Sequence, residues 1–200
     1  MKFSLSTNIK NIQFEDFQYI VTSNARRVLG SLLADYHTGI HCFTLVGTYG
    51  TGKSSFLAAL ERDMLLKTKV LYEEKGQFNS YKKFQCINIV GAYNSLANLL
   101  SEELESNEIN PKELFLHLEQ KLKKHKEKKE FLLVIDEFGK ILEHAANHNP
   151  EKELYFLQQL AEFINHQKHD NILLITTLHQ NFGAYSKKLS EQQRNEWEKV

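Results

Sequence analysis

Short apolar runs alternate along the chain with longer stretches in which apolar residues recur at helical spacing. Runs typical of buried strands lie at 41–46, 84–90, 131–137 and 171–177. The helical spacing predicts helices over 23–37, 54–66, 95–104, 111–129, 150–167 and 186–200. Strands that are joined by connections of helix length form parallel sheets with helices on both faces. We therefore expect an α/β fold, with a mostly parallel sheet between two layers of helices.

Composition and charge exclude several classes of protein. The 25 Lys and Arg balance the 25 Asp and Glu, so net charge gives no argument for nucleic acid or an acidic membrane surface as partner. Cys42 and Cys86 are too few for a disulfide framework, and both lie in apolar runs where a reduced thiol packs as a small hydrophobic group. No apolar stretch approaches the roughly 20 residues of a membrane helix, and the N-terminus does not resemble a secretory signal. We therefore expect a globular, cytoplasmic protein.

The strongest chemical signal is a glycine-rich loop between the first predicted strand and the next helix. Its sequence GTYGTGKS, at 47–54, fits the phosphate-binding pattern G-x-x-x-x-G-K-[ST] at every fixed position. The glycines allow backbone N–H groups to turn inward around a phosphate at a helix N-terminus. We expect Lys53 to reach the β- and γ-phosphate oxygens and Ser54 to bind Mg²⁺. The predicted nucleotide-contacting residues are Gly47, Thr48, Tyr49, Gly50, Thr51, Gly52, Lys53, Ser54 and Ser55.

Two acids, Asp136 and Glu137, end the most apolar of the predicted strands. An acid at the carboxyl end of a strand beside a phosphate-binding loop can hold Mg²⁺. We expect Asp136 to serve the metal and Glu137 to act as the general base that activates water. The alternative is that both acids cap the helix that follows them.

Taken together, LVGTYGTGKSSF, LLVIDEFGK and NILLITTLHQ resemble the Walker A, Walker B and sensor-1 motifs of P-loop NTPases with an additional strand and a catalytic glutamate. AAA+ and STAND-like ATPases are the closest of these. The resemblance implies ATP and Mg²⁺ as ligands, with catalytic roles for Lys53, Glu137 and a polar residue of the sensor strand. Thr177 or its neighbour Thr176 matches that residue by position, although threonine is also common in strands for its β-propensity alone.

The resemblance also has implications for the domain boundaries and for the segments outside the motifs. Such domains continue after the sensor strand with a helix, a fifth strand and often a helical lid, so we expect the chain to be part of a longer protein. Residues 1–37 would form an N-terminal extension with one helix, and 38–200 the ATPase core. The polar segment 67–83 fits either a hairpin or a surface insertion. Phe14, Phe17 and Tyr19 would pack either on an adenine ring or in the core.

Family members use the ATP cycle to switch conformation or assembly, so the resemblance implies a homo-oligomer or larger complex. Arg194 lies on the predicted helix after the sensor strand, near the place where AAA+ proteins carry an arginine finger. The alternative is that Arg194 pairs along its own helix with Glu191 or Glu198. The motifs are also similar to the N-terminal ATPase region of large bacterial anti-phage ATPases, which implies a defence role. The cycle would act on nucleic acid or on protein. The alternative function is a nucleotide-dependent switch or scaffold with little turnover.

Overall fold

The computed structural model describes residues 9–11, 17–66, 68–71, 83–123, 129–166, 172–187 and 189–197. Its strands are β1 (Cys42–Val46), β2 (Lys83–Val90), β3 (Lys129–Asp136) and β4 (Ile172–Leu178). Its α-helices are α1 (Ser23–His37), α2 (Lys53–Leu66), α3 (Leu96–Glu103), α4 (Pro111–Lys123), α5 (Phe138–Asn147), α6 (Pro150–Asn165) and α7 (Glu191–Trp197). Two short 3₁₀ turns, η1 (Ile9–Asn11) and η3 (Phe182–Ala184), complete the described elements.

The four strands form one sheet in the order β1-β4-β3-β2, and each neighbouring pair is parallel. The predicted α/β fold is therefore confirmed. Because β4 lies between β1 and β3, the loop that follows β1 and the acids that end β3 stand on either side of the end of β4. All these carboxyl ends lie at one edge of the sheet, which is where ligands bind in open α/β folds.

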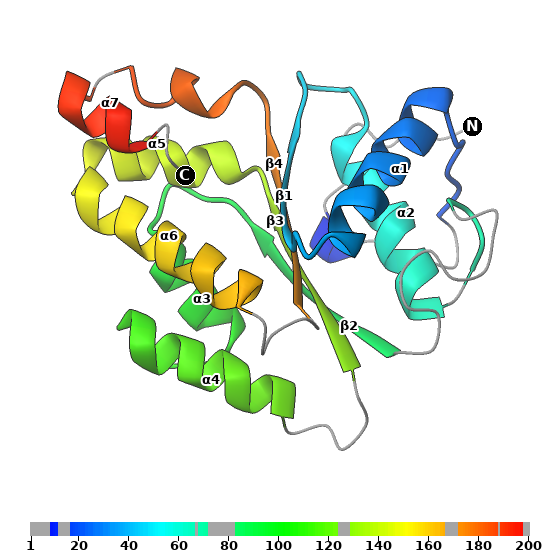
Figure 1. Ribbon diagram of the computed structural model, residues 1–200, viewed down its shortest axis with the longest axis horizontal. Helices are drawn as coiled ribbons and strands as arrows, with labels where there is room; N and C mark the ends of the chain where they lie inside the picture. Colours follow the sequence, from blue (N-terminus) through cyan, green and yellow to red (C-terminus); the bar gives the residue numbers. More distant parts are fainter. Residues whose placement is uncertain are drawn as a thin grey trace.

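Helices cover both faces of the sheet (Figure 1). One face, which we call the α2 face, packs against α1 and α2, and its core includes Leu57, Leu60, Leu132 and Ile175. The opposite face, which we call the α6 face, packs against α3, α5 and α6, with α4 and α7 outside them. The β strands alternate their side chains between these two cores, as a sheet that is buried on both faces requires.

Side-chain caps explain where several helices begin. The hydroxyl of Thr22 accepts a hydrogen bond from the N–H of Ala25 (3.1 Å) before α1, and Ser95 accepts one from Asn98 (3.2 Å) before α3. Asn149 caps α6, in which Pro150 takes the first position. These residue types satisfy N–H groups that a helix leaves without partners, and proline loses nothing there. The sequence thus sets these boundaries locally.

Two predicted helices differ from the structure at their ends. The helix predicted over 111–129 ends at Lys123, and Lys129 already belongs to β3, where it pairs with Lys83 of β2. The helix predicted over 186–200 begins at Glu191, because Ser190 accepts a hydrogen bond from the N–H of Gln193 and so caps α7. Most of the segment 67–83, namely 67 and 72–82, lies outside the described residues. None of the described helices is long and apolar enough to cross a membrane.

Candidate nucleotide-binding site

The glycine-rich loop connects the end of β1 to the start of α2, as predicted. Gly50 and Gly52 have φ angles of 75° and 83°, a left-handed conformation that glycine adopts without strain. The N–H of Gly47 donates a hydrogen bond to the carbonyl oxygen of Leu178 (3.0 Å), which ties the start of the loop to the end of β4. Ser54 and Ser55 lie in the first turn of α2, half-buried. The backbone therefore has the geometry of a loop that wraps around an anion at a helix N-terminus.

Lys53 lies across this loop. Its ammonium group donates hydrogen bonds to the carbonyl oxygens of Gly47 and Thr48, the latter at 3.0 Å. Burial lowers the pKa of Lys53, and the charge of Asp136 opposes that shift. The hydroxyl of Thr51 donates to the same Thr48 carbonyl (2.8 Å), which stiffens the loop beside the ammonium. The lysine is thus positioned over the loop, facing Asp136 across the end of β4.

Asp136 and Glu137 are joined to β4 by one hydroxyl group. Thr177, which is completely buried, donates a hydrogen bond to Asp136 Oδ1 (2.6 Å) and accepts one from the N–H of Glu137 (3.0 Å). Thr176 points to the other face, where its hydroxyl lies 2.9 Å from that of Thr44 on β1. The two threonines therefore lie within the sheet, and Thr177 alone is in contact with the paired acids. Leu178, not Thr177, ends the strand.

The polar side chain at the end of β4 is His179, to which sequence reasoning assigned no role. Its ring stacks on Tyr49 of the loop, with centroids 3.4 Å apart, and its Nδ1 lies 3.4 Å from the Lys53 ammonium. Burial lowers the pKa of His179, and the charge of Lys53 lowers it further. A polar residue directly after a predicted strand, beside a phosphate loop, was the signal that could have identified it.

Glu137 precedes α5 in a left-handed conformation (φ 55°, ψ 38°). Its carboxylate forms an ion pair with Lys140, three residues further along the chain, and this pair raises the pKa of Lys140. The side chain of Glu137 makes no capping hydrogen bond to α5. The capping alternative thus has no hydrogen bond behind it, although Glu137 still places its charge at the N-terminus of α5.

Gly91 holds the end of β2 against this same segment. Its N–H donates a hydrogen bond to the carbonyl oxygen of Asp136 (2.7 Å), and a Cβ at this position would overlap with the carbonyl oxygen of Glu137. Only glycine allows the two strand ends to approach so closely. The close approach fixes the peptide from which the Glu137 side chain projects.

A cavity of about 380 Å³ opens on the α1 side of the loop. Its walls combine β1 and the loop with Tyr19, Thr22 and Asn24 from the start of α1. Tyr19 stacks on Phe17, with centroids 6.3 Å apart, while Phe14 lies outside the described residues. A wall of aromatic, aliphatic and small polar groups next to a phosphate site suits the base and sugar of a nucleotide.

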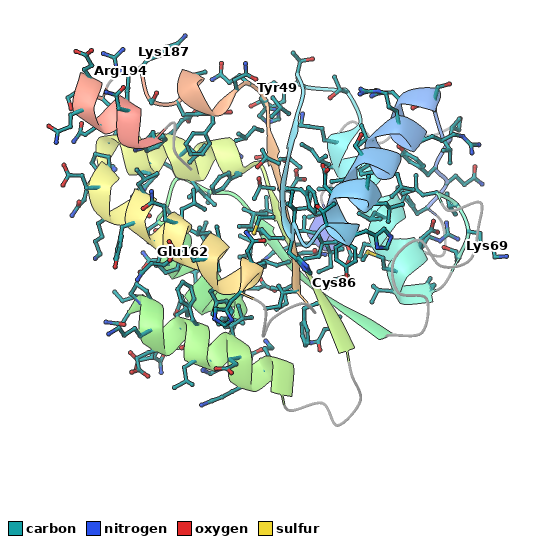
Figure 2. All side chains as sticks on the ribbon, viewed as in Figure 1. Tyr49, Lys69, Cys86, Glu162, Lys187 and Arg194 are labelled. Atoms are coloured by element: carbon teal, nitrogen blue, oxygen red, sulfur yellow. The ribbon has the colours of Figure 1, made fainter. Side chains whose placement is uncertain are left out.

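Arg194 is placed apart from these groups. It lies on α7 with its side chain exposed, and Figure 2 shows it at the outer end of the molecule, far from Tyr49 of the loop. Within this chain the described structure therefore does not bring Arg194 to the phosphate loop. Among the residues that the structure describes, no group of three or more His, Cys, Asp or Glu side chains could hold a metal ion.

The fold and this site define a P-loop NTPase of the STAND type. The family described as Novel STAND NTPase 1 matches residues 24–197, so the chain belongs to that family. No curated protein matches the sequence significantly.

One solved structure supports the fold assignment. The ORC2 protein of Aeropyrum pernix, solved as ADPNP-ADP complexes, superposes with a TM-score of 0.56 at 14% identity, covering 92% of this chain and 49% of that one. This chain thus spans about half the length of that relative. PCH-2 of C. elegans matches with a TM-score of 0.49 at 18% identity, covering 88% of this chain and 42% of the other.

Proposed function

We propose that this domain binds ATP together with Mg²⁺ and hydrolyses the β–γ phosphoanhydride bond. The observation that carries the proposal is the network of Thr177, Asp136 and Glu137, which places two acids across the end of β4 from the loop and Lys53. A carboxylate near the loop and a second one beside it are the two groups that water attack on a γ-phosphate requires.

The donor atoms fit Mg²⁺. This ion prefers a few protein oxygens together with water and phosphate, and the Ser54 hydroxyl and the Asp136 carboxylate are oxygen donors. When bound between them, Mg²⁺ would neutralise charge on the phosphates. Thr177 holds the Asp136 carboxylate by its hydrogen bond (2.6 Å) and so orients it for this role.

The protein's own groups would divide the remaining work. Lys53 would leave the loop carbonyls for the β- and γ-phosphate oxygens and offset the charge that develops there. Glu137 would accept a proton from the attacking water as general base. His179, between Lys53 and Tyr49, would lie beside the γ-phosphate, the role that we first expected of Thr177 or Thr176. The cavity next to α1 would hold the nucleoside, with Tyr19 against the base.

We extend the proposal to the whole protein by analogy with its family. The ATP cycle would change conformation or assembly in a homo-oligomer or larger complex that acts on nucleic acid or protein in the cytoplasm. A role in bacterial defence rests on the motif resemblance alone. The core would span 38–200, with 1–37 as an extension.

A second candidate function is a nucleotide-dependent switch with little turnover. The ion pair between Glu137 and Lys140 favours it, because the ammonium occupies a carboxylate oxygen that the attacking water would use. Both functions share the same nucleotide site and differ only in whether Glu137 becomes free.

Two variants test the proposal together. Lys53→Ala should weaken ATP binding by at least about tenfold, because it removes the side-chain cation that the loop places on the phosphates. Glu137→Gln should retain ATP binding while turnover falls by about 10² or more. Glu151→Gln, an exposed acid in the first turn of α6, is the matched control and should change neither quantity. Calorimetry and phosphate release measure the two effects; unchanged binding in Lys53→Ala would reject the site. Equal, very slow turnover in the wild-type protein and Glu137→Gln would favour the switch.

Arg194 requires an oligomer to take part, since it lies far from the loop of its own chain. We propose that it reaches the γ-phosphate of a neighbouring copy. Mixing Arg194→Ala protein with Glu137→Gln protein should then give more activity than either variant alone, because some sites combine an intact Glu137 with an intact neighbouring arginine. A fully active Arg194→Ala protein would exclude this role.

A further inference from the structure

Lys140 occupies a position that is electrostatically unfavourable for a lysine. It lies in the first turn of α5, where the helix macrodipole is positive and where no acidic residue is present. Its partner is Glu137, directly before the helix, and the ion pair spans three residues. A pair of this kind, with the acid on the N-terminal side, stabilises a helix only weakly. Helix stability therefore gives Lys140 little reason to be there.

The ammonium of Lys140 acts on the same groups that surround the phosphate loop. Together with burial and the stronger effect of Lys53, its positive charge lowers the pKa of His179. The pKa of Lys140 is in turn raised, mainly by the hydrogen bond to Glu137 and slightly by the Tyr49 hydroxyl. The ion pair itself holds the Lys140 ammonium at the carboxylate of Glu137, beside Asp136 at the edge of the site, while the lysine side chain stays half exposed to solvent.

The backbone that carries Lys140 is held in place from the opposite side. A Cβ at Gly139 would overlap with the phenol group of Tyr185, which is buried against the start of α5. Thr177 and Gly91 hold the peptide of Glu137 in the same way. Because both backbones are fixed, the ion pair can open only by a rotation of the two side chains, which is a small and fast motion.

We propose that Lys140 exchanges Glu137 for the γ-phosphate when a nucleoside triphosphate binds, an inference that rests on the proposed function. Without a γ-phosphate, the ammonium holds a Glu137 carboxylate oxygen and keeps it from the attacking water. A γ-phosphate carries more negative charge than one carboxylate and offers three acceptor oxygens, so it draws the ammonium away. The general base is then released only when the substrate, and not the diphosphate product, occupies the site.

The exchange predicts that Lys140 distinguishes triphosphate from diphosphate. Lys140→Met retains most of the side-chain stem and removes the charge. Its affinity for a non-hydrolysable ATP analogue with Mg²⁺ should fall about fivefold, while its affinity for ADP stays unchanged. Lys152→Met is the matched control, because Lys152 is an exposed lysine in the first turn of α6. It should change neither affinity.

The competition itself is tested by Glu137→Gln, in which the ion pair is lost and Lys140 is free for the phosphate. This variant should bind the ATP analogue about threefold more tightly than the wild-type protein, and the gain should vanish in the double variant with Lys140→Met. Calorimetry measures all of these affinities. An equal loss for ATP analogue and ADP in Lys140→Met, no loss at all, or a gain that survives in the double variant would overturn the exchange and leave the proposed function intact. If the wild-type protein bound neither nucleotide, the proposed function would fail and the exchange with it.

Discussion

On the α6 face, side chains such as Phe131 and Leu160 form an apolar core that is almost completely enclosed, whereas the α2 face encloses two carboxylates, those of Glu61 and Asp63. Both acids belong to α2, the helix that begins at the phosphate loop. A buried acid costs free energy unless it is hydrogen-bonded or keeps its proton. The comparison shows that buried carboxylates gather on the face that packs against the helix of the loop. We therefore expect the apolar core of the α6 face to act as a scaffold.

The two acids are satisfied in different ways. Asp63 accepts hydrogen bonds from the N–H groups of Val70 (3.0 Å) and Leu71 (2.6 Å), and from the Thr68 hydroxyl, so it fixes the chain that leaves α2. Glu61 contacts the Asn88 amide of β2 at 2.9 and 3.0 Å, and burial raises its pKa. Asp63 thus serves as a hydrogen-bond acceptor for the chain after α2, whereas the raised pKa of Glu61 favours its protonated form.

The largest loss of stability is expected when a buried leucine is shortened on either face, in Leu160→Ala on α6 or in Leu57→Ala on α2. The two variants should differ in their effect on ADP binding. Both side chains are fully buried, so each change should lower the free energy of unfolding by about 2–5 kcal/mol. Only Leu57→Ala should also weaken ADP binding, because its cavity lies beneath the helix that starts at the loop. Urea denaturation and calorimetry check both points. If Leu160→Ala weakened ADP binding as much, the α6 face would be more than a scaffold.

A smaller loss in the free energy of unfolding is expected for Asp63→Asn. One of the two carboxylate oxygens becomes an amide group, which cannot accept a hydrogen bond from a backbone N–H, so a bond to Val70 or Leu71 is lost. The free energy of unfolding should fall by about 1–3 kcal/mol. Proteolysis after α2 should accelerate in parallel. An unchanged unfolding midpoint would mean that the segment after α2 is held by other contacts.

The smallest change in the free energy of unfolding is expected for Glu61→Gln, and here the protein should become more stable. Because the pKa of Glu61 is raised in the folded state, its contribution to stability is complete below its ordinary value of 4.5 and is lost as the pH rises through the raised value. A neutral amide avoids that loss, and its NH₂ group can donate to Asn88 Oδ1, which has no hydrogen-bond partner among the described residues. We expect about 1 kcal/mol more stability than the wild-type protein at pH 8 and no advantage at pH 4. Denaturation curves at the two pH values measure this, and an advantage independent of pH would contradict it.

Much of the fold could be predicted because its signals are local. Each strand is a short apolar run, and residues such as Thr22 and Pro150 mark helix starts by their own chemistry. The limit appears at Lys129, where a lysine-rich stretch reads as helix but pairs with β2. That pairing depends on a strand 46 residues away in sequence, as Lys83 and Lys129 show, and local propensity does not report such a pairing.

The site, like the fold, could be predicted where its signals are local and not where they depend on contacts between distant segments. The loop could be recognised because its pattern fixes glycine at positions 47 and 52, and the positive φ angle of Gly52 is one that favours glycine. The contacts of His179 with Tyr49 and of Thr177 with Asp136 join separate strands and depend on register. The roles of these residues stay predictions, and the variants above are their tests.

The close approach at Gly91 has a consequence for genetics. A methyl group there would push against the peptide of Glu137, although position 91 has no side chain to offer a nucleotide. A random screen for loss of turnover should therefore recover changes at position 91 as often as changes in the phosphate loop. In such a map of mutational tolerance, Gly91 would be as intolerant of substitution as the residues that take part in the chemistry, because it determines the position of Glu137.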